Sequence, residues 1–327
     1  MIYTLFFSVY GRSFGIYSKS ILTIINSFIL SISHWLSAAR PKTLPLALAS
    51  IVTGSCIAYS QGSHFWSVSL LALLTATLLQ ILSNLANDYG DAQHGTDNEE
   101  RIGPERAIQS GAITLAQMKT AMVICSLLSV ASGLALIFTS LTHSADIWMF
   151  IGLGVASIFC AIAYTVGKKP YGYLGLGDLS VYVFFGLLGV GGTFYLHTQS
   201  IDSLLLLPAT ASGLLAVGVL NVNNMRDLEN DGAFGKTTVA VRLGLEKAKR
   251  YHMVLVSVAW LCYLGFILNN HFSLESLALV VMILGPGIKH LVAIKSASTS
   301  AEIAPLMGDI VKLALIANLL FSIAIIV

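Results

Sequence analysis

Residues Phe65 to Asp97 read FWSVSLLALLTATLLQILSNLANDYGDAQHGTD, and they join two opposite kinds of sequence. The part up to Ser83 carries no charge, whereas the part from Asn84 onward holds three aspartates. An apolar run of this length is typical of a helix that crosses the ~30 Å hydrocarbon core of a bilayer. The stretch therefore predicts a membrane-spanning helix that ends in an acidic motif.

The composition of the whole chain agrees with this reading. Of its 327 residues, 56% are hydrophobic and only 10% are charged, which is too apolar for a soluble domain. Because backbone groups in lipid must bond within their own segment, we expect an all-α, polytopic membrane protein. The nine predicted spans are residues 43–60, 66–88, 115–141, 146–166, 178–197, 203–226, 248–268, 274–294 and 308–327.

The distribution of basic residues predicts the orientation. All 18 Lys and Arg lie in the N-terminal region or at and near the loops after spans 2, 4, 6 and 8. The opposite loops, near 61–65, 142–145, 198–202 and 269–273, hold none. Cytoplasmic loops are enriched in Lys and Arg, so we expect a cytoplasmic N-terminus and an external C-terminus. The expected location is the inner (plasma) membrane of a bacterial cell.

The first 37 residues form a separate segment. Arg12 and Lys19 precede an apolar stretch, Ile21 to Leu30, but no small-residue cleavage site follows it. We expect residues 1–37 to be an N-terminal extension that ends in an interfacial helix around 21–37. Residues 38–327 then form one nine-helix membrane domain.

A second acidic motif follows span 6, in NVNNMRDLENDGAFGKTT (Asn221 to Thr238). Asn223 precedes Asp227 by four residues, as Asn84 precedes Asp88. Four spans separate the two motifs, so both leave the membrane on the same side. The equal offsets suggest a parallel internal repeat of helix groups.

Helical periodicity places the polar residues of each motif on one face, because residues three and four apart are neighbours. Asp97 lies beyond Gly95 and is expected to reach in from a loop. The two faces are predicted to meet across a cavity that opens to the cytoplasm. One stripe comprises Asn84, Asn87, Asp88 and Asp91, and the other comprises Asn223, Asn224, Asp227 and Asp231.

Carboxylates gathered in this way repel one another unless a cation lies between them. Hard oxygen ligands suit Mg²⁺, which binds through one or two carboxylates plus substrate phosphate. Acids at helix ends are often only solvated, but the matching offsets and flanking bases favour a site for two Mg²⁺ and a diphosphate. The predicted metal ligands are Asp88, Asp91, Asp97, Asp227 and Asp231, and the predicted substrate contacts are Asn84, Asn87, Arg101, Arg106, Lys168, Asn223, Asn224 and Lys236.

Three stretches, NDYGDAQHGTD, RAIQSGAIT and RDLENDGAFGKTTVAVRLG, resemble the UbiA superfamily of intramembrane prenyltransferases. The resemblance covers roughly residues 34–327. The family's third acid normally follows the second by four residues, whereas Asp97 follows Asp91 by six. That step, with residues 34–49 and 95–114, is similar to the subgroup that acts on 1,4-dihydroxy-2-naphthoate in menaquinone synthesis.

The resemblance implies an activity and a set of partners. It implies Mg²⁺-dependent transfer of a polyprenyl group from polyprenyl diphosphate to 1,4-dihydroxy-2-naphthoate, with loss of CO₂ and diphosphate, giving demethylmenaquinol. Asp88, Asp91, Asp227 and Asp231 would be the catalytic residues. The expected partners are the two substrates and the lipid bilayer, with no nucleic acid and no obligate protein partner. Tyr89, Tyr164, Tyr171 and Tyr173 either shield an allylic cation or are ordinary interfacial tyrosines.

Other functions fit part of the pattern. Within the prenyltransferases, 4-hydroxybenzoate or a haem precursor is an alternative acceptor. A transporter with two acidic half-sites would place its acids near the bilayer midplane, whereas these lie at cytoplasmic helix ends. A CDP-alcohol phosphotransferase would carry its aspartates on one span rather than on two distant ones.

Overall fold

The computed structural model describes residues 32–96 and 105–327, and every regular element within these ranges is helical. Within these described ranges, eight helices are long and apolar enough to cross a membrane. A ninth span is counted if the helical segment Ile32–Ala39 and helix α2, which meet at 52°, are taken as one. The predicted all-α, multi-pass architecture is confirmed.

The spanning helices match the predicted segments closely. The first four are α2 (Leu44–Ser60), α3 (Trp66–His94), α4 (Leu115–Ser140) and α5 (Ser144–Ala163). The next is composite, with α6 (Gly177–Val181), a π-helical segment (Tyr182–Gly192) and α7 (Thr193–Thr198). The rest are α8 (Leu206–Arg226), α11 (Leu245–Asn269), α12 (Leu274–Met282) with α13 (Leu284–Ser296), and α15 (Leu306–Ala324). Short helices connect them: 3₁₀ turns Tyr171–Leu174 and Ser203–Leu205, α9 (Leu228–Ala233), α10 (Val239–Leu243) and α14 (Ser300–Ile303).

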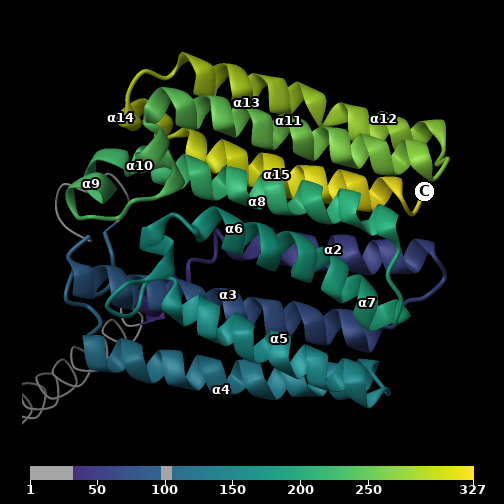
Figure 1. The fold of residues 1–327 in the computed structure, drawn as a ribbon, viewed down its shortest axis with the longest axis horizontal. Helices are drawn as coiled ribbons and strands as arrows, with labels where there is room; N and C mark the ends of the chain where they lie inside the picture. Colours follow the sequence, from purple (N-terminus) through teal and green to yellow (C-terminus); the bar gives the residue numbers. More distant parts are fainter. Residues whose placement is uncertain (1–31, 97–104) are drawn as a thin grey trace, which may run out of the picture.

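The long helices lie side by side along one direction (Figure 1). The short helices α9, α10 and α14 gather at one end of the bundle, and the C-terminus lies at the other. Helix α3 finishes at the same end as α9, so the two acidic motifs leave the bundle together.

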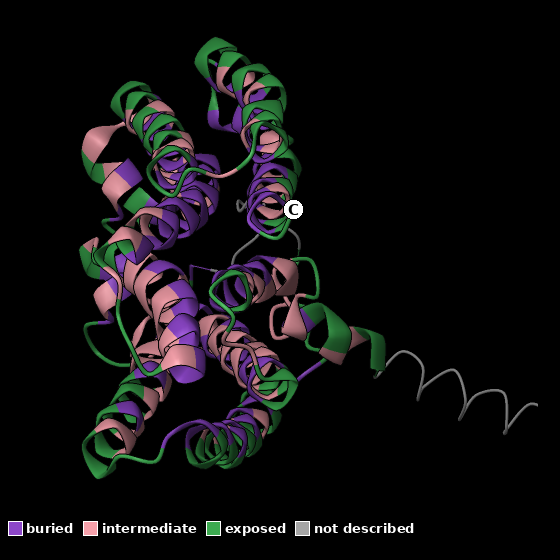
Figure 2. Ribbon diagram, turned by 90° about the vertical axis from the view of Figure 1, so that its right-hand side faces the viewer, coloured by how far each residue is buried: buried purple, intermediate pink, exposed green. Residues whose placement is uncertain are grey.

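The bundle has an apolar outer surface. Seen from the side in Figure 2, residues on the surfaces where helices face one another are buried, and exposed residues lie around the periphery. Large apolar side chains are among the exposed ones, including Leu127 at 65%, Trp148 at 71% and Phe159 at 68%. In water such a surface would be unfavourable, so these helices are suited to contact with lipid.

Aromatic stacking and one buried amide join helices α2, α11 and α15. The rings of Tyr263 and Phe321 stack at 4.3 Å between centroids. The Asn318 side-chain oxygen accepts hydrogen bonds from the Tyr263 hydroxyl at 2.9 Å and from the Thr53 hydroxyl at 3.1 Å. These contacts hold α2, the first complete span, against the C-terminal helices.

Helix α3 is longer than predicted, since it continues past residue 88 to His94. It ends at Gly95, whose φ of +73° is the left-handed conformation that glycine adopts at helix C-termini. Gly90 allows close packing within this extension, because a Cβ there would lie 2.4 Å from the carbonyl oxygen of Thr165. The Thr165 hydroxyl donates to the carbonyl oxygen of Ala86 at 2.9 Å and fixes the crossing.

Of the predicted N-terminal extension, residues 1–37, the structure describes only the last few residues. Residues 1–31 lie outside the described ranges, and the remaining part, Ile32–Ala39, is helical. The boundary at residue 37 and the interfacial helix around 21–37 stay predictions.

Candidate active site

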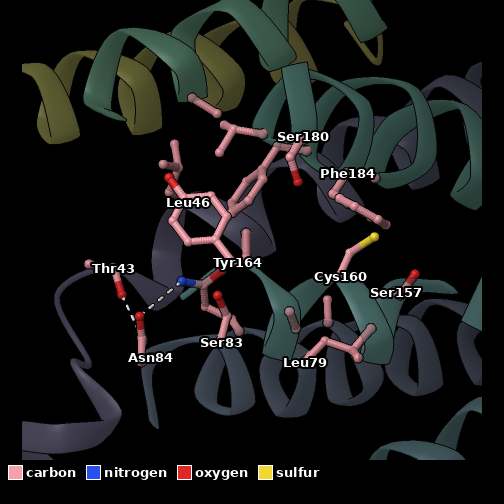
Figure 3. A pocket seen from close by; sticks show the side chains of 18 of the residues that line it. Thr43, Leu46, Leu79, Ser83, Asn84, Ser157, Cys160, Tyr164, Ser180 and Phe184 are labelled. Atoms are coloured by element: carbon pink, nitrogen blue, oxygen red, sulfur yellow. Dashed lines mark hydrogen bonds between the residues drawn. The ribbon is translucent and has the colours of Figure 1, made fainter. Parts of the chain in front are cut away.

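A cavity of about 390 Å³ runs between α2, α3, α5, the π-helical segment and α8. In Figure 3, Thr43 and Asn84 lie toward one side of it, and Ser157, Cys160 and Phe184 lie toward the other. Its polar lining includes Arg40, Asn84, Asn87, Asp91, Arg106, Asn223, Asn224, Asp227, Asp231 and Lys236. Its apolar lining includes Ile51, Ala72, Leu136, Ile137, Phe150, Leu153, Phe184, Leu188 and Leu196. The cavity thus combines a charged region with a long apolar one.

The second acid of the first motif, Asp91, reaches the cavity from α3. The Tyr173 hydroxyl donates to Asp91 Oδ1 at 2.7 Å. Burial, and next the Asp91 charge, raise the pKa of Tyr173, so this phenol stays protonated and remains a donor. The Tyr173 hydroxyl also lies 3.0 Å from the Thr96 hydroxyl. Tyr173 therefore orients the carboxylate rather than lining the cavity itself.

The first acid of the second motif, Asp227, caps the end of α8. The Arg226 guanidinium donates to both of its oxygens, from Nε at 2.8 Å and from Nη2 at 2.5 Å. Nη2 also donates to the side-chain oxygen of Asn223 at 2.9 Å. Arg226 does not line the cavity, so it holds Asp227 and Asn223 from behind while both face inward.

Asp231, on α9, is the second acid of this motif and is 2% exposed. Lys236 Nζ lies 3.3 Å from its Oδ1, whereas Oδ2 is buried with no hydrogen-bond partner in the described chain. Burial raises the pKa of Asp231 to about 6, against the opposing effect of Lys236. Burial lowers the pKa of Lys236, but Asp91, Asp231 and Asp227 raise it by more, so the ammonium stays charged.

Backbone contacts tie the two motifs together. The Asn230 side chain donates to the carbonyl oxygen of Thr96 at 3.0 Å, joining α9 to the turn after α3. The backbone N–H and hydroxyl of Thr237 donate to the Tyr173 carbonyl oxygen at 2.9 and 2.8 Å. The segments that carry Asp91, Tyr173 and Asp231 therefore form one connected unit at the charged end of the cavity, which we call the polar end.

These oxygens suit a hard divalent cation. Among the described residues, no three His, Cys, Asp or Glu side chains come together closely enough to hold a metal alone. Mg²⁺ does not need such a cage, because it keeps waters and takes oxygens from substrate phosphates. The unpartnered Asp231 Oδ2, with Asp91 and Asp227 on the same cavity, fits a Mg²⁺ held partly by diphosphate.

Comparison with known proteins identifies the family. The UbiA prenyltransferase family model matches residues 47–316. This chain belongs to the UbiA prenyltransferase family. A relative from Haemophilus influenzae, named 1,4-dihydroxy-2-naphthoate octaprenyltransferase, is 50% identical over 90% of this chain and 96% of its own length. A relative of the same name from Escherichia coli is 48% identical over 89% of this chain and 94% of its own.

Solved structures of family members share the fold. A UbiA homolog from Archaeoglobus fulgidus, bound to DMAPP and Mg²⁺, aligns with a TM-score of 0.59 at 16% identity, over 90% of this chain and 99% of that one. The apo structure of a UbiA homolog from Aeropyrum pernix K1 aligns with a TM-score of 0.62 at 15% identity, over 88% and 98%. The predicted family and fold are both confirmed.

Nine of the thirteen predicted site residues of this family member line the cavity, two described ones do not, and two lie outside the described residues. Asp97 and Arg101 lie outside the described residues. Lys168 is exposed and does not line the cavity. Asp88 is 1% exposed and also does not line it, because it is turned toward Arg40 and Arg106.

Two arginines and one tyrosine role were missed in the sequence. Arg40 pairs with Asp88, Arg226 with Asp227, and Tyr173 with Asp91. Only Arg226 had a local signal, since it adjoins its partner and lies one turn after Asn223. Of the other tyrosines proposed to shield a cation, Tyr164 and Tyr171 line the cavity and Tyr89 does not.

Proposed function

We propose that this UbiA family member transfers a polyprenyl group from polyprenyl diphosphate to 1,4-dihydroxy-2-naphthoate, releasing diphosphate and CO₂ and forming demethylmenaquinol. The observation that carries the proposal is the two-part cavity. Its charged region, with Asp91, Asp227, Asp231 and Lys236, suits a metal-bound diphosphate, and its apolar region suits an isoprenoid chain. The names of the relatives from Haemophilus influenzae and Escherichia coli support the naphthoate acceptor.

The reaction starts with loss of the diphosphate. Mg²⁺ supplies charge that stabilises the leaving diphosphate when it is bound. Within the chain, Asp91, Asp227 and Asp231 would hold the metal at the polar end, and the Lys236 ammonium adds a donor beside them. The allylic C–O bond breaks, and its electron pair leaves with the diphosphate.

The allylic cation then reacts with the aromatic acceptor. The ring carbon that bears the carboxylate is made electron-rich by the two hydroxyls, and it forms the new C–C bond. That carbon has no proton to lose, so its bond to the carboxylate breaks and CO₂ departs, and the released electron pair restores aromaticity. Tyr164, which lines the cavity, offers an aromatic ring to the cation.

We further infer that the polar end of the bundle faces the cytoplasm of a bacterial cell, across the inner membrane. The basic residues support this, because all 18 lie in the N-terminal region or near this end. Both substrates carry negative charge, so an opening on the cytoplasmic side admits them without moving a charge across the hydrocarbon core.

A single incubation tests the chemistry. Purified protein is supplied with Mg²⁺, a polyprenyl diphosphate and 1,4-dihydroxy-2-naphthoate labelled in the carboxyl carbon. We expect one labelled CO₂ for each diphosphate released and an unlabelled prenylated product. The matched control is Asp91→Asn, which should release neither.

Two results would contradict the proposal. Label retained in a prenylated product would mean that bond formation occurs at another carbon. Efficient prenylation of 4-hydroxybenzoate, with none of the naphthoate, would assign the chain to a different acceptor.

A further inference from the structure

Asp88 differs from the other three motif acids in where it points. Its carboxylate is 1% exposed and does not line the cavity, whereas Asp91, Asp227 and Asp231 do. Two arginines converge on its Oδ1: Arg40 through Nη2, and Arg106 through Nε at 3.6 Å. Both arginines line the cavity, so they stand between Asp88 and any ligand there.

Asn84, one turn before Asp88 on α3, contacts the same part of the chain as Asp88. Asn84 donates its side-chain N–H groups to the Ala39 carbonyl oxygen at 2.9 Å and to the Thr43 hydroxyl at 3.2 Å, the latter in view in Figure 3. Ala39 and Thr43 flank the 52° bend before α2, and Arg40 lies within that bend at a φ of +51°. Asn84 and Asp88 together therefore fasten α3 to the bend that carries Arg40.

The other edge of the acidic motif has a different environment. Asn87 and Asp91 both line the cavity. Asn87 accepts one hydrogen bond, from the Thr165 hydroxyl at 3.2 Å, and Asp91 Oδ1 accepts the Tyr173 hydroxyl. No arginine pairs with either side chain in the described chain. The four residues predicted to form one polar stripe therefore divide into two pairs. Asn84 and Asp88 contact the bend before α2, whereas Asn87 and Asp91 line the cavity.

We propose that Asp88 is a positioning residue rather than a metal ligand: it holds Arg40 and Arg106 at the cavity surface as an anion-binding pair. Metal coordination then falls to the acids that line the cavity. The charges agree, since two guanidinium groups meet the single carboxylate of Asp88. Arg40 Nε is moreover buried without a hydrogen-bond partner among the described residues, which an anionic ligand would satisfy.

The inference rests on the proposed function, in which both substrates are anions. The pair can receive either the carboxylate of the aromatic acceptor or the diphosphate of the prenyl donor. Both present the oxygen geometry that guanidinium groups bind in a bidentate manner. The kinetic arm of the test distinguishes them, because only the KM of the bound substrate depends on the pair.

The first arm measures metal binding without turnover. Mn²⁺ replaces Mg²⁺ in the presence of inorganic pyrophosphate, and electron paramagnetic resonance counts the bound ions in the wild type, Asp88→Asn and Asp91→Asn. We expect Asp88→Asn to bind as many ions as the wild type, with the same affinity, and Asp91→Asn to bind fewer. Loss of an ion in Asp88→Asn would make Asp88 a ligand and overturn the proposal.

The second arm measures the KM of each substrate. We expect Asp88→Asn to raise one KM by about 10–100-fold, which corresponds to loss of one hydrogen bond to a charged group, while the Mn²⁺ concentration needed for activity stays the same. A rise for the naphthoate assigns the pair to the carboxylate, and a rise for the prenyl donor assigns it to the diphosphate. An unchanged KM for both substrates would refute the role.

Two further variants guard against misfolding. Arg106→Gln leaves Asp88 in place and should raise the same KM, and the double variant should lose no more than Asp88→Asn alone. Independent, additive losses would show that the two residues do not act as a unit. If the wild type turned over neither substrate, the proposed function would fail, yet the Mn²⁺ comparison would still decide the role of Asp88.

Discussion

Replacement of Asp231 by Asn is expected to stabilise the metal-free protein while it removes metal binding. Burial raises the pKa of this carboxyl from 3.8 to about 6, so its ionised form is unfavourable in the fold. Each pH unit of such a difference corresponds to about 1.4 kcal/mol, which gives a destabilisation of about 3 kcal/mol at neutral pH. Asn has nearly the same shape and no charge, so it should recover a large part of this energy.

The pH dependence has a definite sign. Because the folded pKa lies above the unfolded one, the stability linked to this group is complete below pH 3.8 and is lost as the pH rises through about 6. Metal-free wild type should therefore lose stability between these values, and Asp231→Asn should lack that component. The affinity for metal should instead increase as the pH rises, since the carboxylate must be ionised to act as a ligand.

Thermal unfolding in detergent measures both effects. In EDTA at pH 7.5, we expect Asp231→Asn to unfold about 4–6 °C above the wild type, at roughly 2 °C for each kcal/mol. With Mg²⁺ and pyrophosphate, the wild type should gain stability and the variant should not. Glu229→Gln is the matched control, because Glu229 is an exposed acid on the same short helix. A variant less stable than the wild type in EDTA, or one that Mg²⁺ still stabilises, would refute the reasoning.

Two other predictions concern packing and topology. Gly90→Ala should destabilise the protein by about 1–3 kcal/mol and lower activity, because the new Cβ meets the Thr165 carbonyl oxygen, whereas Gly152→Ala meets nothing within 4 Å and should be neutral. Thermal unfolding of both variants checks this, and equal stability would contradict it. In a cysteine-free background, Ser200→Cys should react with an impermeant thiol reagent outside intact cells, and Lys168→Cys only after the membrane is opened. The reverse pattern would invert the proposed orientation.

The spans could be predicted because hydropathy and charge act locally along the chain. Each of the last eight predicted segments overlaps one helix or one composite span, and most of the bounds agree to within a few residues. Pro41 signals a break before α2, but the partners of that bend could not be predicted in the same way. They are Asn84 and Asp88 of α3, more than forty positions later in the chain. No feature of residues 32–44 alone specifies such a partner.

The surroundings of the acidic residues could be predicted only in part, for a related reason. Helical periodicity groups Asn84, Asn87, Asp88 and Asp91 on one face, which is correct to within about one quarter of a turn. That face is wide enough to contact two neighbours, the cavity on one edge and the bend before α2 on the other. Which edge each residue occupies depends on how α3 is rotated in the bundle, and the spacing of residues within α3 carries no information about that rotation.

Asp88 and Asp227, the first acids of the two motifs, have different surroundings because their arginine partners come from different parts of the chain. Asp227 receives its guanidinium from Arg226, the adjacent residue, which lies off the cavity and leaves Asp227 facing it. Asp88 receives Arg40 and Arg106 from other segments, and both occupy the cavity surface in front of it. Two aspartates, each preceded by Asn at the same offset of four residues, thus acquire different surroundings. If a repeat relates the motifs, it preserves the acids, while the arginines decide which of them can reach a metal.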